Sequence, residues 1–493
     1  MVGASPWEVC AGPPDEVSLD RLRDASWLEA RIAAAGLASE ARDPVLRGIE
    51  AAANALRRDG VAPGTPAMAH FVPGRVELLG KHTDYAGGRS LLVASEPGIS
   101  VVSVRDARGG VSVLDAREGA TPYRESGVVR RRSWQVYPGT LTRRLRRDFP
   151  DVRGGVRVAF RSTIPPAAGM SSSSGLLVAL FLALGTQWGL HEEEWGGAGS
   201  PLRAPGAGHG DVEGSPHPTR VALADYVAAI EAGRPFEVRR DAGGGDGGEK
   251  LLGGVGTEGG SQDHTAILCC GPARASRFGF RPTRYEGSVE VPPGWAFGVA
   301  VSGVRAPKAG AARDAYNRLA REAAALAEVW PREAGTNGEH LGALLEGGAQ
   351  GMDAVRRTLR RAGGGAGELV PRLEQFAEET FELVPAAFDA FGRADAGALG
   401  EVVGRSHELA ERKLRNQVPE TTELVRLARE LGAPAASAFG AGFGGAVWCL
   451  LPAGSGSEFL ADWRAAYLDR FPSRAGAERF LTTGAAPPAL RLS

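Results

Sequence analysis

One segment, PPAAGMSSSSG at residues 165–175, constrains the fold of this chain more than any other feature. Prolines and a glycine give way to four serines, and a nine-residue apolar run follows at 176–184. Serine is unfavourable inside a helix but common at its start, so the segment predicts a loop that opens a long apolar helix. The free N–H groups and the positive dipole end of such a helix attract phosphate. An ordinary serine-capped helix is the competing interpretation.

Size, charge and cysteine usage exclude several classes of protein. A length of 493 residues suggests about three domains, or two large ones with insertions. The 57 basic and 58 acidic residues leave a net charge of −1, so nucleic acid is not an expected partner. The longest apolar run is far shorter than the roughly 18 residues that span a bilayer, so no membrane segment is expected. The start lacks a signal-peptide pattern and the four cysteines lack metal-binding spacing, which predicts a cytoplasmic protein.

Helical and strand-like patterns are mixed along the chain, which predicts an α+β fold of two domains. The expected helices cover 17–60, the apolar run after the serines, 222–233, most of 310–432, and 457–470. The expected strands lie within 68–80, 90–115, 156–160, 266–304 and 446–451. Gly/Pro-rich segments at 192–217 and 237–260 are interpreted as surface insertions. We expect a helical arm at 1–66, a first domain at 67–285 that includes both insertions, and a second domain at 286–493.

A glycine-rich turn near the C-terminus, FGAGFGG at 439–445, contains a G-x-G-x-x-G pattern. In a dinucleotide-binding fold this pattern follows a strand and opens a helix. Here it leads into AVWCLL, which has the pattern of a strand. The context therefore excludes a dinucleotide site and leaves a tight turn that exposes backbone N–H groups to a phosphate or substrate.

Two further segments concentrate polar residues where strands or loops end. GRVELLGKHTDYAGG at 74–88 places charged and aromatic side chains beside glycines, and GTEGGSQDH at 256–264 brings Asp263 and His264 to the point where a loop enters an apolar run. Taken alone, each segment is explained equally well by a polar junction or a helix cap and by a functional site.

The order of these segments resembles the galactokinase branch of the galacto-, homoserine, mevalonate and phosphomevalonate (GHMP) kinase superfamily. Residues 74–85 are similar to the galactokinase signature, and 165–174 to the superfamily phosphate loop. Residues 440–445 resemble the C-terminal glycine motif, and SHELAERKLRNQVPETTELV at 406–425 resembles the helix that precedes it. The resemblance covers about residues 67 to 452 and implies the two-domain α+β fold of these kinases, with N- and C-terminal kinase domains and the active site in the cleft between them.

The resemblance implies roles for particular residues. Asp263 would accept or orient the proton of the attacking sugar hydroxyl, and Arg75 would neutralise charge on the transferred phosphoryl group. Ser173 would bind Mg²⁺ with Glu231, although the stretch between Glu231 and Asp263 is longer than the family pattern. Phosphoryl transfer depends on positioning and charge stabilisation, which such a set of groups can supply.

The resemblance also implies two binding sets. The expected ATP and phosphate contacts are Pro165, Gly169, Ser171, Ser172, Ser173, Ser174, Gly442 and Gly444. The expected substrate contacts are Lys81, His82, Asp84, Tyr85 and Asp263.

Two departures from the signature concern the sugar. Galactokinases have Asn and Glu where this chain has Glu77 and Lys81, and Asp263 is followed by His264 in place of Gln. Lysine only donates hydrogen bonds, whereas the family glutamate accepts them from the sugar, so galactose itself is uncertain. Either Lys81 helps to select the sugar, or Glu77 and Lys81 pair with each other and point away from it.

We therefore expect an ATP- and Mg²⁺-dependent kinase that phosphorylates a monosaccharide or sugar derivative at the anomeric hydroxyl. The alternative is a kinase-derived protein that senses sugar and ATP and regulates a partner. A mevalonate or homoserine kinase is disfavoured, because those branches lack the His-Thr-Asp-Tyr segment at 82–85.

Overall fold

The computed structural model describes residues 17–125, 134–166, 168–190, 215–236, 254–255, 258–304, 311–334, 340–346, 349–362 and 366–493. The two expected insertions at 192–217 and 237–260 fall for the most part outside these residues. No helix in the described ranges combines the length and the apolarity that crossing a membrane requires.

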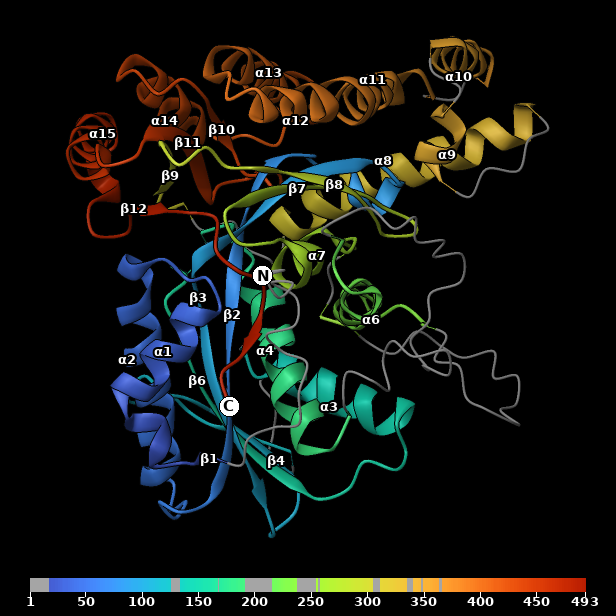
Figure 1. Ribbon diagram of the computed structural model, residues 1–493. Helices are drawn as coiled ribbons and strands as arrows, with labels where there is room; N and C mark the ends of the chain where they lie inside the picture. Colours follow the sequence, from blue (N-terminus) through green and yellow to red (C-terminus); the bar gives the residue numbers. More distant parts are fainter. Residues whose placement is uncertain are drawn as a thin grey trace, which may run out of the picture.

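A large mixed sheet forms the centre of the N-terminal half (Figure 1). Among the described residues it has nine strands, in the order β1-β2-β3-β6-β4-β5, with β13 beside β2, β7 beside β3, and β8 beside β7. Neighbouring strands are antiparallel except for β4 and β6. The strands are β1 (Val17–Ser18), β2 (Pro66–Leu79), β3 (Arg89–Asp106), β4 (Val111–Asp115), β5 (Tyr123–Arg124), β6 (Gly155–Ser162), β7 (Arg274–Gly279), β8 (Arg284–Glu290) and β13 (Leu490–Arg491).

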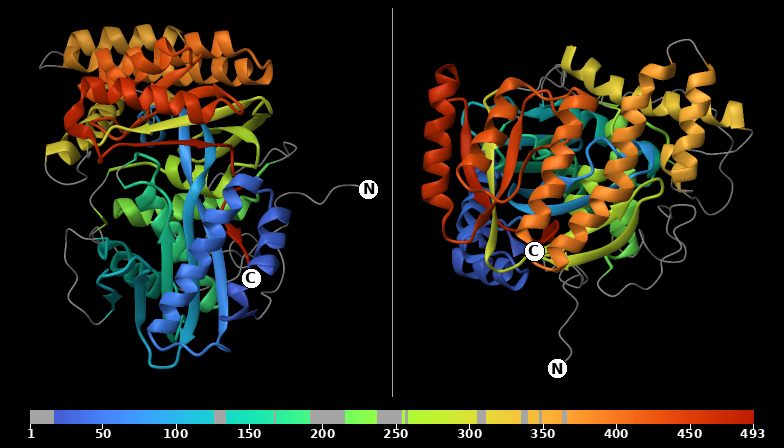
Figure 2. Two further views of the ribbon diagram at one scale, coloured as in Figure 1. Left: turned by 90° about the vertical axis from the view of Figure 1, so that its left-hand side faces the viewer. Right: turned by 90° about the horizontal axis from the view of Figure 1, so that it is seen from above.

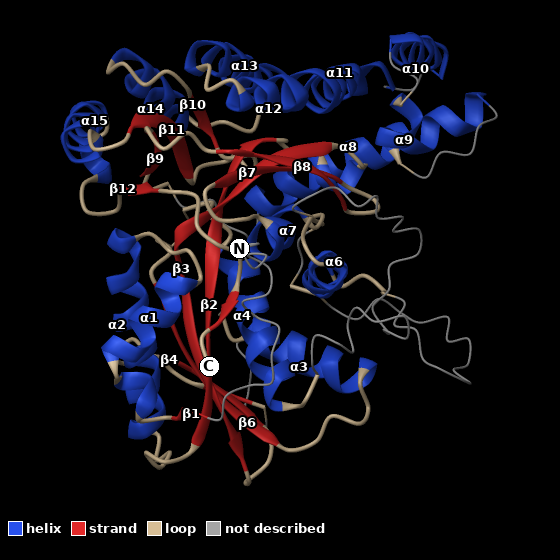
Figure 3. Ribbon diagram, in the orientation of Figure 1, coloured by secondary structure: helices blue, strands red, loops and turns tan. Residues whose placement is uncertain are grey.

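Helices cover both faces of this sheet, as the blue ribbons on either side of the red strands show (Figure 3). Helix α2 packs on β3 and β6, and α4 packs on β2 and β3 from the opposite face. Helix α4 buries side chains on all of its faces, because it lies between the sheet and α3, α6 and α7. The helices are α1 (Ala25–Ala34), α2 (Ser39–Arg58), α3 (Val136–Asp148), α4 (Ser172–Gln187), α6 (Pro218–Ala232) and α7 (Gln262–Cys269), with the short turns η2 (Arg21–Arg23) and η3 (Asp84–Ala86).

Two local expectations need refinement. The segment predicted as a helical arm shares its core with the sheet, since Ile49 and Leu56 of α2 are fully buried in the same cluster as Val101 of β3. Residues 266–269, predicted as part of a strand, end helix α7. The run AILC is buried as a whole, and a short apolar run does not distinguish a helix from a strand by periodicity.

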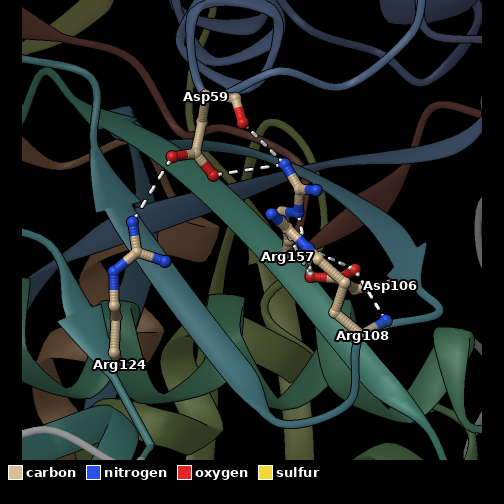
Figure 4. A network of polar contacts seen from close by, with 5 residues as sticks. All are labelled: Asp59, Asp106, Arg108, Arg124 and Arg157. Carbon is tan, nitrogen blue, oxygen red and sulfur yellow. Dashed lines mark hydrogen bonds and ion pairs between the residues drawn. The ribbon is translucent and has the colours of Figure 1, made fainter.

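A network of ion pairs fastens the end of α2 to the sheet (Figure 4). Arg157 of β6 donates to the backbone oxygen of Asp59 at 2.8 Å and to the Asp106 carboxylate at 2.9 Å. Arg124 and Arg108 extend the network from β5 and from the turn after β3. None of its five residues is a predicted site residue, and the network is interpreted as structural.

A smaller antiparallel sheet begins the C-terminal half, in the order β10-β11-β9-β12. Helices α14 and α15 cover it, with Trp463 and Tyr467 fully buried against it. The strands are β9 (Trp295–Val301), β10 (Ala436–Ala438), β11 (Ala446–Pro452) and β12 (Arg479–Thr483), and the helices are α14 (Pro419–Glu430) and α15 (Gly456–Arg470), followed by η7 (Pro472–Arg474). The chain passes from one sheet to the other between β8 and β9, close to the expected boundary at 285/286, which stays a prediction.

A layer of helices lies at one end of the molecule, as the view from above shows (Figure 2). It agrees with the helices predicted for 310–432, within the described residues. Its elements are α8 (Ala311–Ala334), α9 (Leu341–Leu345), α10 (Ala349–Ala362), η4 (Ala366–Leu369), α11 (Val370–Glu378), α12 (Val384–Gly392) and α13 (Ala396–Leu409), with π-helical turns η5 (Glu379–Leu383) and η6 (Ala410–Leu414). Contacts of α12, α13 and η5 with β2, β3, β7 and β8 join this layer to the large sheet.

Candidate active site

A cavity of about 170 Å³ lies where the two halves of the chain meet. Its walls come from the end of β2, the residues that follow it, the first turns of α4 and α7, the end of α6, and the glycine turn before β11. The polar lining residues are Arg75, Glu77, His82, Asp84, Ser174, Glu231, Gln262, Asp263, His264 and Tyr316.

The cavity brings Arg75 and Asp263 together, although 188 positions separate them in the sequence. The Arg75 Nε and Nη2 atoms lie 2.8 and 2.7 Å from Asp263 Oδ1, and Nη1 donates to the backbone oxygen of Gly169 at 2.5 Å. Burial disfavours the charged guanidinium, but the carboxylates of Asp263 and Glu77 more than offset this and raise the pKa of Arg75. Arg75 thus stays charged and ties β2 to the serine loop and to α7.

A second group of side chains joins three helices beside this ion pair. Ser174 in the first turn of α4 donates to Glu231 Oε2 of α6 at 2.8 Å, and its hydroxyl lies 3.4 Å from Asp263 Oδ2. His264 Nε2 of α7 lies 3.1 Å from the same Glu231 oxygen. The sequence placed Glu231 and Asp263 in one site, and the structure brings them together through Ser174.

The serine segment differs in detail from its prediction. Ser171, the N-cap residue, has a left-handed backbone (φ 60°) and its side chain makes no capping hydrogen bond, so the expected capping role is wrong at this position. Ser172 is exposed, and Ser173 is buried without being among the described residues that line the cavity. Ser174 is the serine that faces Glu231, while Pro165 lies outside the lining.

Residues 80–88, which we call the signature turn, bring His82 and Asp84 to the cavity wall. Asp84 Oδ2 accepts the backbone N–H of Gln262 at 3.2 Å, and burial raises the pKa of the Asp84 carboxyl. Burial, and then the charge of Arg372, lower the pKa of His82 to about 3, so its ring is neutral. Tyr85 is not among the described lining residues, because its hydroxyl turns to His82 Nδ1 at 2.9 Å.

Lys81 does not reach the described cavity wall. Its side chain is fully buried, and its Nζ donates to Ser406 Oγ at 3.0 Å. The expectation that Lys81 contacts the sugar is therefore corrected by its placement. The alternative of a Glu77–Lys81 pair is met only in part. No direct ion pair joins the two described side chains, since Glu77 Oε2 accepts from Gln262 Nε2 at 2.5 Å and lines the cavity. Burial raises the pKa of the Glu77 carboxyl, however, and the charge of Lys81 acts on that carboxyl and opposes the rise.

Sequence reasoning missed three polar lining residues: Glu77 as part of the wall, Gln262 and Tyr316. The sequence could have indicated Glu77, because a carboxylate on a buried strand needs hydrogen-bond or charged partners. Gln262 is the partner of Glu77 Oε2, whereas Glu77 Oε1 is buried without a hydrogen-bond partner among the described residues. Oε1 lies so close to Gly440 that an added Cβ there would be 2.3 Å away. Tyr316 stands 5.0 Å from the His82 ring, centre to centre, and no local pattern in the long helical region singles it out.

The glycine turn presents its backbone to the cavity, as predicted. Gly442 and Gly444 line it with φ angles of 64° and 116°, a region that favours glycine. At Gly442 an added Cβ would lie 2.2 Å from the backbone oxygen of Asn416. Glycine is thus required there both by conformation and by space.

Comparison with known proteins gives three matches to family models. Residues 62–103 match the galactokinase galactose-binding signature, 137–198 the GHMP kinases N terminal domain, and 387–469 the GHMP kinases C terminal model. A galactokinase of Streptomyces coelicolor is 26% identical over 400 residues, which is 79% of this chain and 85% of the relative. A galactokinase of Enterococcus faecalis is 28% identical over 133 residues, 25% of this chain and 33% of the relative.

The fold is also that of a solved galactokinase. The crystal structure of the Lactococcus lactis galactokinase complexed with galactose matches with a TM-score of 0.66 and 18% identity, covering 86% of this chain and 94% of the other. The matched N- and C-terminal models, together with the fold, identify the chain as a kinase of the GHMP superfamily. Within that superfamily the chain is a galactokinase-like member, an ATP-dependent sugar kinase.

Proposed function

We propose that this kinase transfers the γ-phosphoryl group of ATP to the anomeric hydroxyl of a free monosaccharide or close derivative. The observation that supports this most is the carboxylate of Asp263, held by the buried Arg75 at the cavity wall with 29% of its own side chain exposed. A carboxylate fixed in this way can accept or orient the proton of a sugar hydroxyl while remaining accessible to it.

The surrounding groups suit the remaining tasks of phosphoryl transfer. The Arg75 guanidinium beside Asp263 would neutralise charge that spreads over the phosphoryl oxygens. The N-terminus of α4 and the backbone of the glycine turn border the same cavity and would hold the phosphates through N–H groups. His82 and Asp84 would bind sugar hydroxyls from the signature turn.

The donor set beside Asp263 fits Mg²⁺. Ser174 and Glu231 supply a hydroxyl and a carboxylate oxygen 2.8 Å apart, and Mg²⁺ in kinases takes one or two protein oxygens, with phosphates and water completing its shell. Within the described residues no three His, Cys, Asp or Glu side chains gather as a metal cluster, which is compatible with such sparse ligation. When bound, the ion would offset phosphate charge. Ser173 stays a proposed ligand beside Ser174.

The charge of the cavity favours a sugar rich in hydroxyl groups over an acidic one. Its described lining includes the carboxylates Glu77, Asp84, Glu231 and Asp263, whereas Arg75 is already paired and Lys81 is turned away. Hydroxyl and amino groups donate hydrogen bonds to carboxylates, but a uronic acid would place like charges together. Galactose, which the relatives' names indicate, is one candidate. A cytoplasmic location stays a prediction.

The test is ADP release, coupled to a reporter reaction, with ATP, Mg²⁺ and a panel of neutral, amino, acidic and deoxy sugars and heptoses. We expect release with a neutral or amino sugar and none with its methyl glycoside, in which the anomeric hydroxyl is blocked. Equal rates with the glycoside would contradict anomeric transfer. Binding of both ligands without ADP release would favour the sensor alternative, which no comparison supports.

A further inference from the structure

The backbone of the signature turn includes residues in the left-handed region. Gly80 and Gly87 have positive φ angles of 109° and 78°, and His82, which has a side chain, has a φ of 57°. Residues in this left-handed region persist where the surrounding structure determines them. The contacts that hold the turn therefore also determine where His82 and Asp84 stand in the cavity.

Thr83 supplies hydrogen bonds within the turn, to the oxygen of Gly80 and from the N–H of Gly88. One face of a helix in the C-terminal half supplies further contacts, to residues 80–82. Arg372, Gln375 and Glu379 follow at intervals of three and four residues, which places them on one face of α11 and its continuation η5. All three are at most 2% exposed. We call these residues the clamp face.

The clamp face holds the turn through its backbone. Arg372 Nη2 donates to the His82 oxygen at 2.5 Å, and Gln375 Nε2 donates to the Lys81 oxygen at 3.1 Å. Glu379 Oε1 accepts the N–H groups of Gly80 at 2.8 Å and of Lys81 at 3.2 Å. Three consecutive residues of the turn are thus bonded to a helix almost 300 positions away.

The carboxylate of Glu379 is balanced by the side chain of Lys81. Lys81 Nζ donates to Ser406 Oγ at 3.0 Å, and the Ser406 hydroxyl donates to Glu379 Oε1 at 2.9 Å. All three side chains are fully buried, and we call them the sealed centre. A buried charge that loses its partner is strongly destabilising, whereas removal of both charges is tolerated far better.

We propose that Lys81 and Glu379, linked by Ser406, are positioning residues for the sugar: they hold the signature turn from the C-terminal helical layer and so set sugar affinity without touching the sugar. This inference rests on the proposed function of the cavity. It assigns to Lys81 a role in place of the direct contact that the sequence suggested, and it adds Glu379 and Ser406 to the residues on which sugar binding depends.

The experiment is a charge-removal cycle with Glu379→Gln, Lys81→Met and the double variant, assayed with the best substrate of the sugar panel. Each single variant should raise KM for the sugar roughly tenfold or more, because a small displacement of binding groups is costly. KM for ATP should change little, and the double variant should recover most of the sugar affinity. Asp148→Asn, which breaks the buried pair with Arg144 in α3, is the control: it should lower the melting temperature and leave KM for the sugar unchanged.

Two results would overturn the proposal. If the double variant is no better than the worse single variant, and Lys81→Met changes the order of preference among sugars, then Lys81 contacts the sugar. If all variants lose kcat and melting temperature together and leave KM unchanged, as a general loss of stability would cause, the centre is merely structural. Should Glu379→Gln fail to fold, Ser406→Ala must raise KM for the sugar by a smaller factor.

A second measurement does not depend on turnover. Hydrogen exchange at the Gly80 and Lys81 amides should be faster in Glu379→Gln than in the unchanged protein, and restored toward it in the double variant. Unchanged exchange would contradict the proposal even if the kinase activity is confirmed. Absence of sugar-dependent ADP release in the unchanged protein would instead contradict the proposed function.

Discussion

Two groups of charged side chains lie near each other in this kinase and differ in their access to the cavity. Arg75, Asp263, Ser174 and Glu231, the cavity centre, line the cavity, and Asp263 keeps 29% of its side chain exposed. Lys81, Ser406 and Glu379 of the sealed centre are fully buried and bonded to one another and to backbone. The comparison shows that a charged residue in a binding signature can act on the substrate directly or can hold the binding residues in place. Access of its side chain to the cavity distinguishes the two roles.

The largest expected effect is at the cavity centre. Asp263→Asn keeps the shape of the side chain but removes the proton acceptor and the charge that pairs with Arg75, so kcat should fall on the order of 10²-fold or more. ATP affinity, measured by calorimetry, should stay within a few-fold. Asp462→Asn on the exposed face of α15 is the matched control and should leave kcat unchanged. Near-normal turnover of a folded Asp263→Asn protein would remove this residue from the mechanism.

An intermediate effect separates two neighbouring serines. Ser174→Ala removes the hydroxyl that faces Glu231, so the Mg²⁺ concentration for half-maximal rate should rise several-fold. Ser173→Ala should have the smaller effect on Mg²⁺, and Ser172→Ala, at an exposed position, should have none. Mg²⁺ titrations of the three variants, with melting temperatures, check the order. A larger effect from Ser173 would make that serine the ligand, as the family resemblance implies.

The smallest effect is on stability and belongs to His407, the residue after Ser406 of the sealed centre. Burial, and then the charge of Lys81, lower the pKa of His407 to about 3, from 6.5 in an unfolded chain. Between these values the unfolded state binds more protons, so the free energy of unfolding should fall as the pH drops below about 6.5 and be constant above it. His407→Gln should make that decline shallower. Denaturant unfolding between pH 4 and 8 measures it, and equal slopes for both proteins would contradict the assignment.

The sequence was sufficient for most of the fold and for assigning Arg75 and Asp263 to one site. The pattern of apolar residues predicted the long helix after the serines, the strands of residues 68–115 and the helices of 310–432. Such patterns arise because the faces that pack against neighbouring elements must be apolar. Arg75 and Asp263 were placed in one site because their segments resemble parts of one family, and the structure joins them at 2.7 Å.

The direction of Lys81 could not be predicted in the same way. It depends on Ser406 and Glu379, which are about 300 positions away and carry no motif that pairs them with the signature turn. The separate arrangements of Ser171 and Ser174 could not be predicted for a similar reason. The left-handed backbone of Ser171 and the contact of Ser174 with α6 arise from tertiary packing, not from local preference.

The central claim is that the cavity transfers a phosphoryl group to a sugar, and transfer of label from γ-labelled ATP tests it most directly. With the best sugar of the panel, the unchanged protein should move the label into a sugar phosphate in one-to-one proportion with ADP. Label found in inorganic phosphate, or ATP left intact while both ligands are bound, would contradict the account.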